Sequence, residues 1–280
     1  MRRRPTRARW SGLLAGAAAL LSLVGGYAGA QVRPDTRAPI VVERIRAPIA
    51  PEVPIGDRII TLVRVDLSRY RLRIVTEEHD GQRRSVPQWV HDLHLAGAIN
   101  AGMFLPNGRS VGFMMREGTV VSDRHVTKYR GVIGFGPRRA GAPELVVTGT
   151  GCGQTTRSVG QRYQNVLQAF EMVDCRGRPA TWASRKRYSA AGLGVDREGR
   201  AVFMHTRTPY RMTVLDRMLA DPALGIRGMI YMEGGPEASL FVDADGIEVS
   251  EVGSYETGFF ENDSNREFWA VPNVIAFEAR

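Results

Sequence analysis

The sequence predicts an α+β domain that consists mainly of antiparallel or mixed β-sheet, with a few short helices. Short segments in which apolar and polar residues alternate recur along the chain, separated by turn residues, whereas few stretches have the apolar spacing of a helix. The sequence contains no fixed-period repeat, and 280 residues with 43% hydrophobic content suit one substantial core. We therefore expect a single domain over residues 57–280.

The first thirty residues have the three parts of a secretory signal peptide. Five arginines and no acidic residue precede an uncharged apolar run, which is followed by small residues at Ala28–Ala30. The alternative is an uncleaved membrane anchor, but the glycine-containing run is at the short limit for a spanning helix. Cleavage after Ala30 is therefore favoured, and we expect a secreted or periplasmic protein without a stable membrane span.

The segments after the leader define the expected elements in order. Residues 31–56 contain five prolines and read as an extended spacer. Residues 58–78 alternate around a turn at Leu67–Tyr70, which predicts a β-hairpin. Residues 86–93 have helical spacing after Pro87, and we expect Gly97 to end this helix before a short strand at Ala98–Ile99.

The rest of the chain continues this pattern. Hairpin-like segments follow at 112–123, at 131–137 and at 191–206, the last around a turn at Asp196–Gly199. Residues 213–221 predict a short amphipathic helix, and Gly228–Met232 predicts a buried strand. Residues 239–249 and 268–279 add further strands.

The net charge argues against nucleic acid as a partner. The formal charge of the whole chain is +9, but removal of residues 1–30 lowers it to +4, and the remaining basic residues are scattered.

Cys152 and Cys175 are the only cysteines, and an even pair in an oxidising compartment predicts a disulfide; two unpaired buried thiols are the alternative.

The segment with the strongest signal for an active site is Glu233-Gly234-Gly235-Pro236-Glu237. A buried strand leads directly into it, so Glu233 stands where a carboxylate faces a cleft, and adjacent glycines allow a sharp turn that exposes amides to an anion. A tight β-connection with a solvated glutamate is the alternative and is common.

Three further segments contain candidates on weaker grounds. Asn100 follows a strand and Gly102 permits close backbone approach, which suits substrate orientation as well as a plain chain reversal. Arg187 and Ser189 belong to a basic, hydroxyl-bearing stretch that suits a phosphodiester or a solvated loop. His205, at the end of a predicted strand, suits an acid or base, although a lone histidine is more often a packed residue.

Taken in order, these segments resemble the phosphodiester glycosidase family, in particular its bacterial branch of secreted proteins. The similarity covers residues 59–280 and is carried by the strings AINAGMF, VGFMMREG, LQAFEMVDCRGRP, YSAAGLGVDREGRAVFMHTRTPY and MIYMEGGPEASLFV. Glu233 stands where the family usually has Asp, one methylene shorter. Pro236 and Glu237 fit the bacterial branch.

The resemblance implies an exported hydrolase that cleaves a sugar-1-phosphodiester bond in an envelope or extracellular glycan. It implies a catalytic carboxylate role for Glu233, with His205 as a reserve acid or base. The residues implied in substrate binding are Asn100, Gly102, Arg187, Ser189, Gly234, Gly235, Glu237 and Ser239.

A non-catalytic glycan-binding or phosphodiester-binding module is the alternative, since Glu233 departs from the family pattern. A structural role in the cell envelope is a further alternative. No cofactor and no metal-ligand set is predicted, and the involvement of a divalent cation, the sugar, the aglycone and the oligomeric state stay open. The expected partner is a glycan or glycosyl phosphate.

Overall fold

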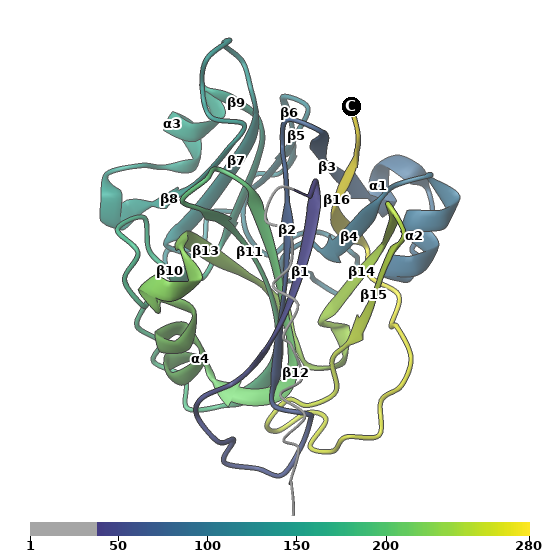
Figure 1. Cartoon of the computed structure of the whole chain (residues 1–280). Coiled ribbons are helices and arrows are strands. Elements are labelled where there is room, and N and C mark those ends of the chain that lie inside the picture. The colour runs from purple at the N-terminus through teal and green to yellow at the C-terminus, as the bar shows by residue number, and fades with distance from the viewer. Residues whose placement is uncertain (1–37) are drawn as a thin grey trace, which may run out of the picture. The chain divides into compact units, whose positions relative to one another are not determined.

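A computed structural model describes residues 38–280, which form three antiparallel sheets (Figure 1). The predicted signal peptide, residues 1–30, lies outside the described residues. Every strand pair in residues 38–280 is antiparallel, and the helices are short, which confirms the mainly antiparallel α+β prediction. No helix in this part of the chain is long and apolar enough to cross a bilayer.

The first sheet has six strands and carries most of the candidate residues. Its order is β1 (Ile40–Arg46), β2 (Ile59–Val65), β12 (Ala201–Arg211), β11 (Arg187–Asp196), β13 (Ile226–Gly234) and β10 (Glu171–Val173).

The other two sheets have five strands each. One has the order β15 (Ile247–Val252), β14 (Ser239–Ala244), β4 (Gly97–Asn100), β16 (Asn273–Ala279) and β3 (Tyr70–Thr76). The other has the order β6 (Thr119–Ser122), β5 (Met114–Arg116), β9 (Tyr163–Ala169), β7 (Gly131–Pro137) and β8 (Leu145–Gly149).

Short helices and 3₁₀ turns cover or connect these sheets. The α-helices are α1 (Glu77–Asp80), α2 (Val86–Asp92), α3 (Thr156–Gly160) and α4 (Met212–Leu219), and the 3₁₀ turns are η1 (Thr150–Cys152), η2 (Pro222–Leu224) and η3 (Gly235–Glu237). The predicted helices at 86–93 and 213–221 correspond to α2 and α4. Figure 1 shows α4 beside β10, which it contacts together with β12.

The sequence accounts for the start of α2 but not for its end. The backbone N–H of Ser85 donates to the side-chain oxygen of Gln88 (2.9 Å), and fully buried Trp89 donates to the carbonyl of Val271 (3.1 Å). The helix ends at Asp92, and Gly97 is the first residue of β4 rather than the helix terminus that the sequence predicts.

The predicted hairpin at 58–78 is wrong, although both of its strands exist. β2 pairs with β1 on one side and β12 on the other, so neither of its edges is open to β3. β3 pairs instead with β16, in another sheet. Local alternation specifies a strand and its buried face, but the choice of partner depends on distant segments.

The predicted spacer is in part a strand. Ile40 and Val41 are almost fully buried, and β1 pairs along its whole length with β2. The prolines flank this strand at positions 39 and 48, where a missing N–H does not break the ladder. The folded part therefore begins well before residue 57.

Two apolar clusters lie around the six-stranded sheet. The larger one includes Phe203, Leu193 and Met232 together with buried residues of the other two sheets, so it forms the common core. The second includes Met204 and Tyr231 with the buried face of α4. Successive residues of a strand alternate between these clusters.

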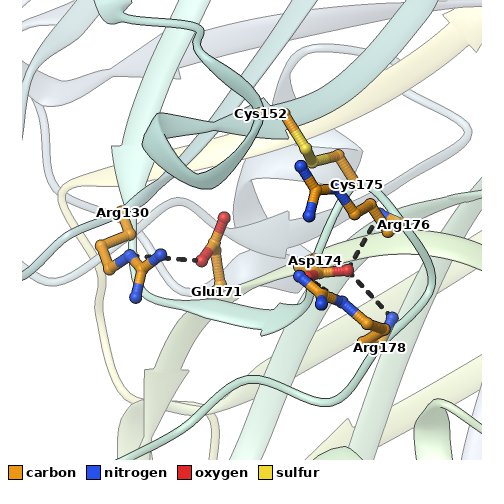
Figure 2. Close-up of a disulfide and its surroundings, with 7 residues drawn as sticks. All are labelled: Arg130, Cys152, Glu171, Asp174, Cys175, Arg176 and Arg178. Carbon is orange, nitrogen blue, oxygen red and sulfur yellow. Dashed lines mark hydrogen bonds and ion pairs between the residues drawn. A yellow bond between two sulfur atoms is a disulfide. The ribbon is translucent and has the colours of Figure 1, made fainter.

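The disulfide prediction is confirmed. Cys152, in η1, is bonded to Cys175, which follows β10, with the two Cα atoms 6.6 Å apart (Figure 2). Beside it, Asp174 accepts from the side chain of Arg178 (2.8 Å), and Glu171 faces Arg130 (3.9 Å). The Cys152–Cys175 disulfide therefore ties the segment between β10 and Trp182 to the η1 turn.

Candidate active site

Glu233 is the second-to-last residue of β13, and the residue as a whole is partly exposed. The backbone N–H of Gly234 donates to its Oε1 (3.0 Å). The pKa of Glu233 is raised to about 8, mainly by burial and also by nearby Glu237 and Glu256, while the Gly234 hydrogen bond acts in the opposite direction. Glu233 is therefore mostly protonated at neutral pH and is able to give a proton to a substrate.

The turn after β13 brings two more carboxylates together. Gly235 has φ +68°, and a Cβ atom there would lie 3.2 Å from Oε2 of Glu256 and 3.5 Å from Oε2 of Glu237. Glycine is needed both for this left-handed backbone and for the close approach. Burial raises the pKa of both glutamates, while Lys186, 4.0 Å from Glu256, lowers that of Glu256.

Gly234 is needed for a different contact. A Cβ atom at this position would overlap the hydroxyl of Tyr231 and lie 3.0 Å from Cβ of Tyr188. The backbone N–H of Gly234, one of the amides expected to bind an anion, already donates to Glu233. The Gly-Gly turn therefore positions carboxylates and tyrosines, and this amide is engaged.

Four aromatic rings form a continuous row next to Glu233, defined here as the aromatic row: Tyr129, Phe170, Trp182 and Tyr231. The centroid distances are 4.5 Å from Tyr129 to Phe170, 4.4 Å from Phe170 to Trp182 and 5.5 Å from Trp182 to Tyr231. Phe170 and Trp182 are partly exposed. Burial, with a contribution from Glu233, raises the pKa of Tyr129 to about 12, so the row stays neutral.

Asn100 is nearly fully buried and has one unused donor. Its Oδ1 accepts from the backbone N–H of Ser239 (3.0 Å), and this bond fixes the orientation of the amide. Its Nδ2 is buried without a protein partner. Since a buried unpaired donor is costly, Asn100 is suited to donate to a bound molecule. Gly102 follows with φ +71°, at the bend that leads to Met103, whose sulfur accepts from Tyr129 (3.1 Å).

Ser189 and Ser239 are both fully buried and hold the backbone. The hydroxyl of Ser189 donates to the carbonyl of Arg207 (2.6 Å) and accepts from the N–H groups of Ser254 and Tyr255 (3.0 Å each). Its capacity is used, and it places the segment that carries Glu256. Ser239 donates to the carbonyl of Glu237 (3.0 Å) and so fixes the η3 turn.

Arg187 is directed toward another glutamate. Its Nη1 lies 2.9 Å from Oε2 of Glu52, which also pairs with Arg211. The neighbouring cation, Lys186, is the one that faces Glu256. The predicted basic stretch therefore reaches the carboxylate cluster, but through a different residue from the one expected.

His205 has other neighbours than Glu233. Its Nε2 lies 3.2 Å from the carbonyl of Ala238, and its Nδ1 lies 3.9 Å from Glu251. Burial lowers its pKa to about 4. It follows Met204 in β12 and so faces the common core. Glu233 instead interacts electrostatically with Tyr129, Tyr231, Glu237 and Glu256. The structure does not bring the two predicted catalytic residues together.

Sequence reasoning missed Glu256, Lys186 and the aromatic row. Glu256 lies in an irregular segment that joins β15 to β16, and its bridge to Tyr188 is long-range. The aromatic residues come from four separate segments, so no spacing links them. A surface cavity of about 580 Å³, lined among others by Arg71, Glu117 and Arg139, includes none of the predicted site residues. No group of three metal-ligating side chains occurs within residues 38–280.

Comparison with known proteins places this fold. Residues 94–278, more than half of the chain, match the model of the phosphodiester glycosidase family. The catalytic domain of zebrafish N-acetylglucosamine-1-phosphodiester alpha-N-acetylglucosaminidase, auto-inhibited by its pro-peptide, has a TM-score of 0.61 at 14% identity; the match covers 88% of this chain and 85% of that one.

A hypothetical protein from Synechocystis has a TM-score of 0.59 at 14% identity, over 86% of this chain and 62% of that one, so this chain spans less than two thirds of its length. No curated protein matches the sequence. The structural matches show the fold, and the sequence match over 94–278 shows that the chain belongs to the phosphodiester glycosidase family.

Proposed function

We propose that this protein is an exported hydrolase that cleaves a sugar-1-phosphodiester bond in an envelope or extracellular glycan. The observation that carries the proposal is the protonated Glu233 at the end of β13, with Glu237 and Glu256 around the adjacent turn. Membership of a glycosidase family supports the reaction type. The leader-like sequence of residues 1–30 and the Cys152–Cys175 disulfide support export.

Glu233 is assigned the role of proton donor to the glycosidic oxygen. A general acid must be protonated at the working pH, and the pKa of about 8 meets this requirement. A neutral Glu233 also avoids repulsion of an anionic phosphodiester. Because a phosphate monoester is a good leaving group, this reduced repulsion matters alongside the proton transfer.

Glu237 or Glu256 supplies the second carboxylate. Glycosidases commonly combine an acid with a second carboxylate that acts as nucleophile or base. Both glutamates approach Gly235 from the same side of the chain, as the distances from its Cβ position indicate. Lys186 favours the ionised form of Glu256, which makes Glu256 the stronger candidate for the base.

The polar and aromatic neighbours are assigned to substrate binding. The free Nδ2 of Asn100 is assigned as donor to a sugar hydroxyl or a phosphate oxygen. The partly exposed rings of Phe170 and Trp182 are assigned to the apolar face of a sugar. Ser189 and Ser239 are positioning residues, and Arg187 is left out because it pairs with Glu52.

The decisive experiment is hydrolysis of a panel of sugar-1-phosphodiesters by the mature protein, with and without a chelator. We expect release of free sugar from at least one member, at a rate that inorganic phosphate inhibits. If no member of the panel is hydrolysed, the proposal is contradicted. Binding of a member without turnover would instead support the glycan-binding alternative, which the aromatic row also favours.

A further inference from the structure

The aromatic row carries a cation on its accessible side. The ammonium nitrogen of Lys128 lies 5.5 Å from the centroid of the Phe170 ring. Lys128 is exposed, and the next residue, Tyr129, is the first ring of the row. The chain has only two lysines, Lys128 and Lys186, among 38 basic residues, and the structure places both beside the candidate active site.

Among the described residues Lys128 has no carboxylate partner, in contrast to three neighbouring cations. Lys186 faces Glu256, Arg187 pairs with Glu52, and Arg130 faces Glu171. Within residues 38–280, Lys128 has no ion pair, and its described contact is with the face of Phe170. Its three N–H donors are therefore available to an anion.

The charge balance of the site calls for such a cation. Glu237 and Glu256 lie at the turn beside the neutral Glu233, and within residues 38–280 Lys186 is the only cation that pairs with this cluster. A phosphodiester must approach these carboxyl groups, so a cation next to the aromatic row lowers the repulsion. An ammonium above an aromatic ring also matches a ligand with an apolar sugar face joined to an anion.

We propose that Lys128 recognises the phosphate of a sugar phosphate whose sugar ring packs on Phe170 and Trp182. This inference rests on the proposed function, because it assigns the phosphate subsite of that reaction. It replaces Arg187 with Lys128 as the phosphate-binding residue. Without a ligand, the cation–π contact holds the ammonium in place over the ring.

The test measures binding and does not require turnover. Isothermal titration of the mature protein with inorganic phosphate and with N-acetylglucosamine 1-phosphate is compared for wild type, Lys128→Gln and Phe170→Leu. Arg157→Gln is the control, because Arg157 is also exposed and lies on α3, outside the site. Thermal unfolding establishes that each variant is folded.

We expect Lys128→Gln to weaken binding of both ligands about tenfold, as for loss of one charge-assisted hydrogen bond. Phe170→Leu should weaken binding of the sugar phosphate but not of inorganic phosphate, and Arg157→Gln should change neither by more than about twofold. Equal phosphate affinity of wild type and Lys128→Gln, or no phosphate binding by the wild type, would overturn the inference.

The two proposals fail in different ways. If the substrate panel is not hydrolysed but phosphate binding depends on Lys128, the hydrolase proposal fails and the anion site stands. If the panel is hydrolysed and Lys128→Gln has an unchanged KM, the hydrolase proposal stands and the role of Lys128 is refuted.

Discussion

Glu233 and His205 lie in register with the same residue, yet their surroundings differ completely. Both are opposite Ala191 of β11, His205 from β12 and Glu233 from β13, with a register shift next to Ala191. His205 faces the common core, where a carbonyl and Glu251 surround it. Glu233 faces the aromatic row and two further glutamates.

Burial keeps both side chains uncharged at neutral pH, but with different consequences. It lowers the pKa of His205 to about 4 and raises that of Glu233 to about 8. Only Glu233 is partly exposed, so only it can exchange a proton with a substrate. A shifted pKa therefore identifies a candidate catalytic group only together with access.

The largest expected effect is that of Glu233→Gln. Glutamine preserves the shape of a protonated glutamate but gives no acidic proton, so kcat should fall about 10²–10⁴-fold. Wild-type activity should fall about tenfold per pH unit above pH 8, because the acid form is lost there. Steady-state kinetics from pH 5 to 10 measures both.

The matched control for this prediction is Glu248→Gln, an exposed glutamate on β15. It should retain wild-type kcat and pH dependence. A folded Glu233→Gln protein with wild-type kcat would remove the catalytic distinction between the two sides of the sheet.

His205 should affect stability instead of chemistry. Its folded pKa of about 4 lies below the unfolded value of 6.5, so the unfolded state binds the extra proton first as the pH falls. The contribution of neutral His205 to the free energy of unfolding is fully present above pH 6.5. About 3 kcal/mol of it is lost between pH 6.5 and pH 4.

Urea unfolding of wild type and His205→Gln at several pH values isolates this contribution, because the other titrating groups are common to both proteins. The wild type should lose more stability toward pH 4 than the variant, while kcat at pH 7 changes little. Equal pH dependence, or loss of turnover in a folded variant, would show that His205 belongs with Glu233 after all.

Removal of the disulfide should lower the stability of the protein. The disulfide closes a loop across 23 positions, so replacement of Cys152 and Cys175 by serine should lower the unfolding free energy by about 3 kcal/mol. Denaturant unfolding measures the loss. A reductant should destabilise the wild type and leave the double variant unchanged; a wild type insensitive to reductant would refute the role.

Gly235→Ala should give the smallest change in stability. A φ of +68° costs an alanine about 1–2 kcal/mol. Gly199→Ala is the control, since Gly199 has φ +82° but no atom within 4 Å of its Cβ position. Both variants should unfold more easily, and only Gly235→Ala should lose activity, because its methyl group displaces Glu256. Equal activity in both would show that the carboxylate spacing is not critical.

Much of the fold could be predicted from local sequence. The predicted hairpins at residues 112–123 and 191–206 are confirmed. In each hairpin a short turn joins the two strands, and apolar and polar residues alternate clearly on both sides of it. The hairpin at 58–78 was not predictable in the same way, because β2 and β3 find their partners at β12 and β16, far along the chain.

The site could be predicted only where it is local. The strand end at Glu233 and the η3 turn follow from one continuous segment. Glu256 and the rings of Phe170 and Trp182 meet this segment through the sheet topology, which carries no signal in the spacing of the residues. The sequence predicts Arg187 as a substrate-binding residue because it does not reveal that Glu52 lies nearby.

The position of β16 has a consequence for the order in which the protein is made. β16 is the last of the described strands in sequence order, yet it lies between β4 and β3 in its sheet. During synthesis this sheet is incomplete until residues 273–279 have emerged, because β16 fills the gap between β4 and β3. Folding of this sheet must therefore wait until residues 273–279 have been made, about 200 positions after β3, so β3 and β4 stay without their shared partner strand until then.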